Sequence, residues 1–263
     1  MTEVIDRRRS LRLLGGGLAG LAGATALASC GGGDDPTTST TIAAGDDATS
    51  AADAGTCTAV PQETAGPYPA DGSNGPDVLG EEGVVRQDIR SSFAGSSGTA
   101  AGVPLTIDLT ILSVAAGCTP LAGAAVYLWH ADAEGRYSIY SRGVTDQNYL
   151  RGVQVADGDG KLTFTSVYPG CYDGRWPHIH FEVFETEADA TGGGTKLRTS
   201  QIALTEESAA AVYATDGYGQ STRNLARTSI GSDMVFADGA SLQTPTVSGS
   251  AAEGFTIALT VPV

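Results

Sequence analysis

Histidine is scarce in this chain of 263 residues, which has only His130, His178 and His180. A metal centre built from four histidines is therefore excluded. Basic residues are also few, because 15 lysines and arginines stand against 30 aspartates and glutamates, for a net charge of −15. An acidic surface repels the phosphate backbone, so we expect no nucleic-acid partner. Hydrophobic residues still make up 41% of the chain, enough for a sizeable buried core.

The first 29 residues have the pattern of an export signal. Arg8-Arg9-Ser10-Leu11 fits the twin-arginine motif, and the uncharged stretch 13–28 that follows is too short and too rich in glycine for a comfortable membrane span. Leu27-Ala28-Ser29-Cys30 resembles a lipobox, which predicts a lipid anchor on Cys30. The alternative is a general secretory signal cleaved near Ala28. Both patterns predict an exported, extracytoplasmic protein.

Residues 30–56 are composed mainly of Gly, Ser, Thr, Asp and Ala, with a single isoleucine and no aromatic residue. Such a segment buries too little apolar surface to fold, so we expect an acidic, flexible tether. The folded domain is then predicted to span residues 57–263. Membrane contact is expected only through the lipid on Cys30.

Apolar and polar residues alternate in segment 105–111, which is the mark of a half-buried strand. Further strand candidates are 125–130, 162–167, 178–184, 200–204 and 255–261, most of them separated by turns that carry Gly or Pro. One helix is expected at 205–213, where Thr205 can cap the first turn. Many short strands with few helices predict an all-β fold, an antiparallel β-sandwich with long loops and one short helix.

His178 and His180 lie two residues apart, so on a strand both rings point to one face and can reach one metal ion. Ile179 then points into the core. A coincidental surface pair is the alternative, and a cupin signature is matched only in part, because no histidine follows His180.

Phenolate donors beside two imidazoles would suit ferric iron. Tyr137 and Tyr172 are candidates, although spacing alone does not select them from nine tyrosines.

Several ordered motifs together resemble the intradiol ring-cleavage dioxygenases, the non-haem ferric enzymes that open catechols between the two hydroxyls. The resemblance runs through most of residues 57–205. Its main segments are Glu63-Thr64-Ala65-Gly66-Pro67-Tyr68, Val85-Arg86-Gln87-Asp88-Ile89-Arg90, 120–132, Gly135-Arg136-Tyr137-Ser138, 168–181 and Ser200-Gln201-Ile202. The N-terminal signal resembles that of the secreted branch of the family.

The resemblance implies a site of six residues. Tyr137, Tyr172, His178 and His180 match the four ligands of a non-haem Fe(III) ion, and Tyr172 matches the ligand that leaves the metal when substrate binds. Arg175 matches an arginine that stabilises negative charge on the substrate ring. Gln201 matches a glutamine on the oxygen-binding side. The alternatives are a structural salt bridge for Arg175 and a strand-pairing role for Gln201.

The implied activity is cleavage of a catechol by O2 to a cis,cis-muconate-type diacid, with a small aromatic diol and O2 as the partners. Two other classes stay open: a metal-binding or carbohydrate-binding β-sandwich lipoprotein without catalysis, and a cupin-type oxygenase. We expect a monomer or a homodimer.

The cysteines of the folded domain and His130 are expected to have structural roles. Cys57 and Cys118 are the expected disulfide pair, because both flank strand-rich segments and lie away from the metal-binding loop, which leaves Cys171 unpaired. His130 is expected to be structural or to support the site from behind, and not to be a ligand.

Overall fold

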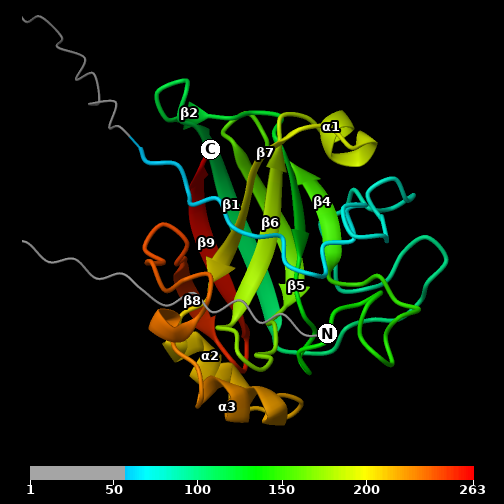
Figure 1. Ribbon diagram of the computed structural model, residues 1–263, viewed down its shortest axis with the longest axis vertical. Coiled ribbons are helices and arrows are strands. Elements are labelled where there is room, and N and C mark those ends of the chain that lie inside the picture. Colours follow the sequence, from blue (N-terminus) through cyan, green and yellow to red (C-terminus); the bar gives the residue numbers. More distant parts are fainter. Residues whose placement is uncertain (1–56) are drawn as a thin grey trace, which may run out of the picture. The chain divides into compact units, whose positions relative to one another are not determined.

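The structure is a computed structural model that describes residues 57–263 (Figure 1). The export signal, the lipobox and the tether predicted for residues 1–56 lie outside the described residues.

The described chain forms two β-sheets, as the alternating sequence patterns predict. The larger sheet has the strand order β2-β1-β9-β8, and β5 also pairs with β1. Its strands are β1 (Pro104–Ser113), β2 (Thr119–Pro120), β5 (Lys161–Val167), β8 (Thr246–Ser250) and β9 (Gly254–Pro262). Pairing is antiparallel except between β1 and β9, which run parallel with Leu105 opposite Phe255.

The smaller sheet carries the histidine pair. It has the order β4-β3-β6-β7, and all its pairs are antiparallel. Its strands are β3 (Ala125–Trp129), β4 (Arg151–Val155), β6 (His178–Phe184) and β7 (Lys196–Ala203). In this register Trp129 and Gln201 both lie opposite His180, one on each neighbouring strand.

The main core lies between the two sheets and confirms the predicted sandwich. Ile179, Phe181 and Val183 of β6 point into it and are fully buried. His178 and His180 alternate with them and therefore face the other side of the smaller sheet. That outer face is itself covered by the long segments that connect the strands, so the histidines are buried as well.

The expectation of a single helix is wrong. The described part of the chain has the 3-10 turn Ile230–Ser232 and three α-helices, which are α1 (Glu187–Gly192), α2 (Glu206–Tyr213) and α3 (Gly219–Leu225). Only α2 was predicted, and Thr205 caps it by accepting a hydrogen bond from the Ser208 backbone NH. The other two are under two turns long, too short to show helical periodicity. No helix of residues 57–263 is both long and apolar enough to cross a membrane.

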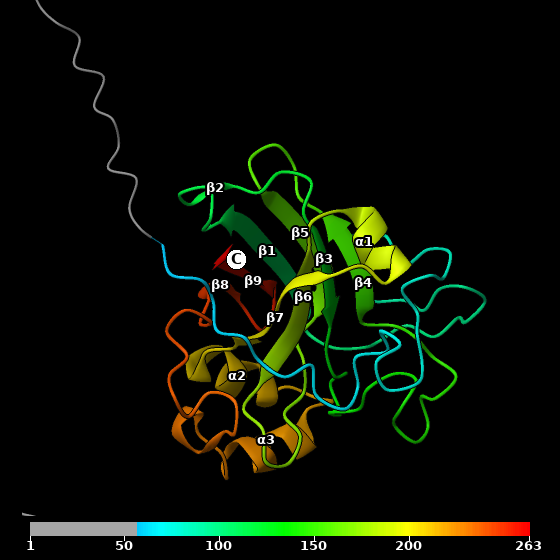
Figure 2. The ribbon, with the colours of Figure 1, turned by 45° about the horizontal axis from the view of Figure 1, so that its top comes forward.

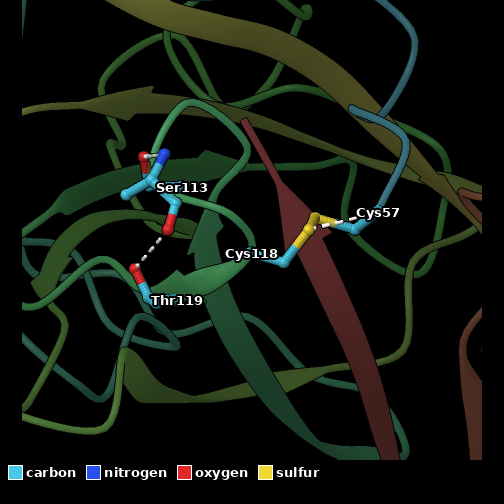
Figure 3. Close-up of a disulfide and its surroundings, with 5 residues drawn as sticks. Cys57, Ser113, Cys118 and Thr119 are labelled. Carbon is cyan, nitrogen blue, oxygen red and sulfur yellow. Dashed lines mark hydrogen bonds between the residues drawn. A yellow bond between two sulfur atoms is a disulfide. The ribbon is translucent and has the colours of Figure 1, made fainter. Parts of the chain in front are cut away.

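Helices α2 and α3 lie side by side at one end of the sheets, whereas α1 lies near the opposite end (Figures 1 and 2). A disulfide joins Cys57 to Cys118 beside the connection from β1 to β2 (Figure 3), which confirms the predicted pair. Cys171 is buried and unpaired.

Candidate metal centre

Strand β6 presents two imidazoles to one point, at the end of the smaller sheet where β6 begins and β7 ends. The Nε2 atoms of His178 and His180 lie 3.1 Å apart, and each residue is 3% exposed. His178 Nδ1 donates to the Trp176 carbonyl at 2.5 Å, which leaves the Nε2 lone pair free. The His180 ring stacks on Trp129, with 4.9 Å between ring centroids.

Two interlocked loops bring two phenols to the same point. Tyr137 lies in the loop after β3 and Tyr172 in the loop before β6. The loops approach so closely that a Cβ on Gly170 would lie 2.5 Å from the Ala133 carbonyl oxygen. Gly135 has φ +79°, and a Cβ there would lie 3.2 Å from Tyr172 Cβ. Glycine at both positions therefore allows the tyrosines to meet.

The four predicted ligand atoms converge. Tyr172 Oη lies 3.1 Å and Tyr137 Oη 3.4 Å from His178 Nε2. Bonds of about 2 Å to a first-row metal ion place ligand atoms about 3 Å apart, so the donor set fits one shared ion. Within residues 57–263 no group of three or more His, Cys, Asp or Glu side chains could hold a metal ion. A metal centre here therefore depends on the tyrosines.

Burial sets the protonation of these groups. It lowers the pKa of His178 to about 3, and burial together with His178 holds the pKa of His180 well below its usual value. Both imidazoles are neutral as a result, which is the form that binds metals. Burial also raises the pKa of both phenols, that of Tyr137 most strongly. A phenolate at this site thus requires the charge of a bound cation.

Arg175 and Gln201 complete the cluster. Arg175 Nη1 lies 3.3 Å from His178 Nε2 and 3.5 Å from Tyr172 Oη, and its Nη2 donates to Gln201 Oε1 at 2.7 Å. Gln201 Nε2 in turn donates to the Thr64 carbonyl at 2.9 Å. The structure thus brings together all six residues that the resemblance implies. Their roles as ligands and catalytic groups stay predictions.

Asp233 is a site residue that the sequence did not reveal. It is fully buried, and its Oδ2 accepts from Arg175 Nε at 2.8 Å and from the Trp176 backbone NH at 2.6 Å. Burial alone would raise the pKa of Asp233, but these hydrogen bonds hold it below its usual value. Asp233 lies far along the chain in a segment with no motif, so only the fold reveals the contact.

Gly66, within the motif Glu63-Thr64-Ala65-Gly66-Pro67-Tyr68, lies next to His180. It has φ +69°, and a Cβ on it would lie 3.4 Å from His180 Cε1, so this segment covers the His180 ring. His130 is placed as expected for a structural residue. Its Nε2 is bonded to Ser166 Oγ at 2.7 Å and its Nδ1 to the Ala131 carbonyl at 2.8 Å.

Comparisons with known proteins agree with this fold. Residues 74–180 match a family model described as "Dioxygenase". An intradiol ring-cleavage dioxygenase from Tetranychus urticae superposes with a TM-score of 0.62 at 24% identity, covering 78% of this chain and 94% of that one. The predicted resemblance to the intradiol ring-cleavage dioxygenases is therefore confirmed, and the chain has their fold.

A chlorocatechol 1,2-dioxygenase of Rhodococcus opacus is 40% identical over 55 residues, which are 21% of each protein. The chain thus matches about a fifth of the length of that curated relative.

Proposed function

We propose that this protein is a non-haem Fe(III) dioxygenase that cleaves a catechol between its two hydroxyls. The reaction joins one catechol with one O2 to give one cis,cis-muconate-type diacid, so no other oxidant or reductant is needed. The observation that carries the proposal is the convergence of two phenol and two imidazole donors on one point. The match to the dioxygenase family and the shared intradiol fold support it.

The donor set suits ferric iron in particular. Phenolate oxygens are hard donors that stabilise a highly charged cation, and two neutral imidazoles complete the set of four. When bound, the ion supplies Lewis-acid activation and a template for substrate.

The protein's own residues divide the remaining tasks. Tyr137 is enclosed, at 1% exposure, whereas Tyr172 is partly exposed and is the phenol placed to give way to an incoming catechol oxygen. Arg175 places a guanidinium beside the ligands, where it stabilises negative charge on the substrate ring. Asp233 and Gln201 hold that guanidinium from two sides. Gln201 is itself fixed by Thr64, so it orients groups without adding charge.

A non-catalytic metal-binding or carbohydrate-binding sandwich is the other class considered. A site that only stores metal has no need of a positive charge next to its ligands, because the charge opposes cation binding. Arg175 Nη1 lies 3.3 Å from His178 Nε2 and is held there by a buried carboxylate, which favours the enzyme. A cupin-type oxygenase is disfavoured by the shared intradiol fold.

The export signal and the lipobox extend the proposal to location. We place the enzyme outside the cytoplasm, anchored to the membrane by a lipid on Cys30, as a monomer or a homodimer. A lipid attached to Cys30 in the mature protein, found by mass spectrometry, would support this. A mature chain that begins after Ala28 without lipid would favour the general secretory signal.

Oxygen uptake by iron-loaded protein with a panel of catechols tests the activity. The expected result is one O2 consumed for each catechol, with the ultraviolet spectrum of a muconate-type diacid. Resorcinol is the matched control, because its hydroxyls are not adjacent and it cannot bind through both. Absence of uptake from a protein that holds one iron per chain, or a product cleaved outside the two hydroxyls, would contradict the proposal.

A further inference from the structure

Arg151, the first residue of β4, is a buried charge with no acidic partner. It is 1% exposed, and no carboxylate of residues 57–263 lies within 4 Å of its guanidinium. Burying an unpaired charge is costly unless hydrogen bonds compensate. Burying the Arg151 charge therefore costs free energy, and we look for a function of the guanidinium that a neutral side chain of similar size could not perform.

All of the guanidinium's hydrogen bonds go to neutral oxygens. Nη1 donates to the Tyr68 and Pro69 carbonyls, each at 2.9 Å, and to Tyr127 Oη at 3.2 Å. Nε donates to Ser138 Oγ and Nη2 to the Ser138 carbonyl, each at 3.1 Å. The planar fork of an arginine is needed to reach these separate groups at once.

These oxygens belong to two segments that meet at the metal centre. Ser138 directly follows Tyr137 in the chain. Tyr68 and Pro69 follow Gly66, which covers His180, and the Tyr68 ring lies 4.7 Å from the Tyr137 ring. Arg151 therefore links the backbone that carries one predicted ligand to the segment that encloses it.

We propose that Arg151 is a positioning residue that fixes Tyr137 as a metal ligand by holding Ser138 and the Tyr68–Pro69 segment together. The Tyr137 NH donates to Ser141 Oγ at 2.9 Å, and the Tyr137 carbonyl accepts from the Ser141 and Tyr140 NH groups at 2.8 and 3.2 Å. These contacts lie within the loop itself, whereas Arg151 ties the next residue, Ser138, to the Tyr68–Pro69 segment. Loss of the Arg151 contacts leaves the loop, and with it the phenol, free to shift from the point where the four donors meet.

The inference rests on the proposed function only in taking Tyr137 as a ligand. The test compares Arg151→Lys with Arg86→Lys. Arg86 is a matched control, because its guanidinium also donates to backbone carbonyls, those of Ile89, Ser91 and Arg151, but makes no hydrogen bond to either tyrosine loop. Lysine keeps the charge and loses the fork in both variants.

Two readouts are taken at a temperature where circular dichroism shows the variants folded: iron affinity by chelator competition, and the visible band expected for tyrosinate bound to ferric iron. Replacement of a residue that orients a metal ligand costs about 10–100-fold in metal affinity. We expect a loss of this size and a shifted band in Arg151→Lys, and near wild-type values in Arg86→Lys. Equal values in the two variants would overturn the inference.

If Arg151→Lys does not fold, Ser138→Ala is the second variant, because it removes the Oγ contacts with Arg151 Nε and the Tyr149 carbonyl and keeps the Arg151 bond to the Ser138 carbonyl. It should weaken iron binding and shift the band relative to Arg86→Lys, and wild-type behaviour would contradict the positioning role. The wild-type spectrum separates the two claims. A wild-type protein without a tyrosinate band contradicts the proposed function, whereas a normal wild-type band with unchanged variants contradicts only the role of Arg151.

Discussion

Arg175 lies beside the predicted metal ligands without being one of them, so its proposed role in turnover can be tested separately from iron binding. It touches the ligand cluster through Nη1 but is held by Asp233 and Gln201, so it is fixed without being a ligand. We expect Arg175→Ala to keep iron and colour and to lose about 10²–10³ in kcat, as for other stabilising donors. Steady-state oxygen uptake and an iron assay measure both effects.

Arg223→Ala is the control for that experiment, because Arg223 is exposed and bonds only to Gln220 in its own helix. It should leave turnover unchanged. Near wild-type turnover in Arg175→Ala, or a loss explained entirely by missing iron, would refute the role of Arg175.

The lowered pKa of Asp233 predicts that the stability of the folded protein depends on pH. Its pKa is held below 3.8 in the folded state, so the folded protein binds fewer protons there than the unfolded chain. The stabilisation is therefore present above the unfolded pKa and is lost as the pH falls through the folded pKa. Breaking a buried ion pair costs about 3–5 kcal/mol, so Asp233→Asn should be destabilised by this amount at neutral pH.

Urea unfolding of wild type and Asp233→Asn between pH 7 and pH 2 measures the difference. The gap in unfolding free energy should be constant at neutral pH, should begin to narrow below about pH 4, near the unfolded pKa, and should close as the pH falls through the folded pKa. A gap that is the same at every pH would show that the Asp233 charge does not matter.

At the residue scale, the sequence predicted the ligand cluster through its motifs and not through spacing. The His178 and His180 pair follows from strand alternation, but nothing local selects Tyr137 and Tyr172 from nine tyrosines. Asp233 and Arg151 could not be predicted, because their contacts join segments that are distant in the chain.

At the scale of the helices and strands, some local sequence signals are enough to predict an element and others are not. Strand β1 was predicted because its period-two alternation reflects half-burial, whereas β3 and β6 are buried along their whole length and do not show it. Strands β2, β4 and β8 were missed, since Thr119–Pro120 is only two residues long and Arg151–Val155 and Thr246–Ser250 carry Gly and polar residues without clean alternation. The parallel pairing of β1 with β9 was also missed. No tight turn joins these strands, so no local signal sets their direction.

The interlocked loops predict the effect of Gly170→Ala. The new Cβ would meet the Ala133 carbonyl oxygen at 2.5 Å and the Gly135 nitrogen at 2.7 Å, and both contacts are with backbone. We expect a loss of about 1–3 kcal/mol in unfolding free energy and weaker iron binding, because the loops that carry Tyr137 and Tyr172 are forced apart.

Gly158→Ala is the matched control, because its Cβ would meet nothing within 4 Å and its φ is not positive. Thermal unfolding and iron titration of both variants decide the matter. Equal behaviour of the two variants would show that the close approach of the loops is not needed.

At the scale of the whole molecule, one disulfide ties the start of the described domain to the connection between β1 and β2 (Figure 3). Cys57 and Cys118 are separated by 61 residues. Cross-links of this kind stabilise by about 2–4 kcal/mol, mainly by restricting the unfolded chain. The double variant Cys57→Ser with Cys118→Ser should lose this amount in urea unfolding while its iron site stays intact.

Mass mapping under non-reducing conditions provides the check on the pairing. A peptide that links Cys57 to Cys118 and leaves Cys171 as a free thiol is expected. A link from Cys171 to either partner would require a different arrangement of the loop that carries Tyr172.

The shared centre of two tyrosines and two histidines is tested most directly by the visible absorption spectrum of the iron-loaded protein. Ferric iron bound to phenolate absorbs visible light, so wild type should be coloured. Tyr137→Phe and Tyr172→Phe should each weaken or shift the band, since each removes one of the two phenol oxygens near His178 Nε2. A colourless iron-loaded wild type, or a band unchanged in both variants, would contradict the proposed ligand set.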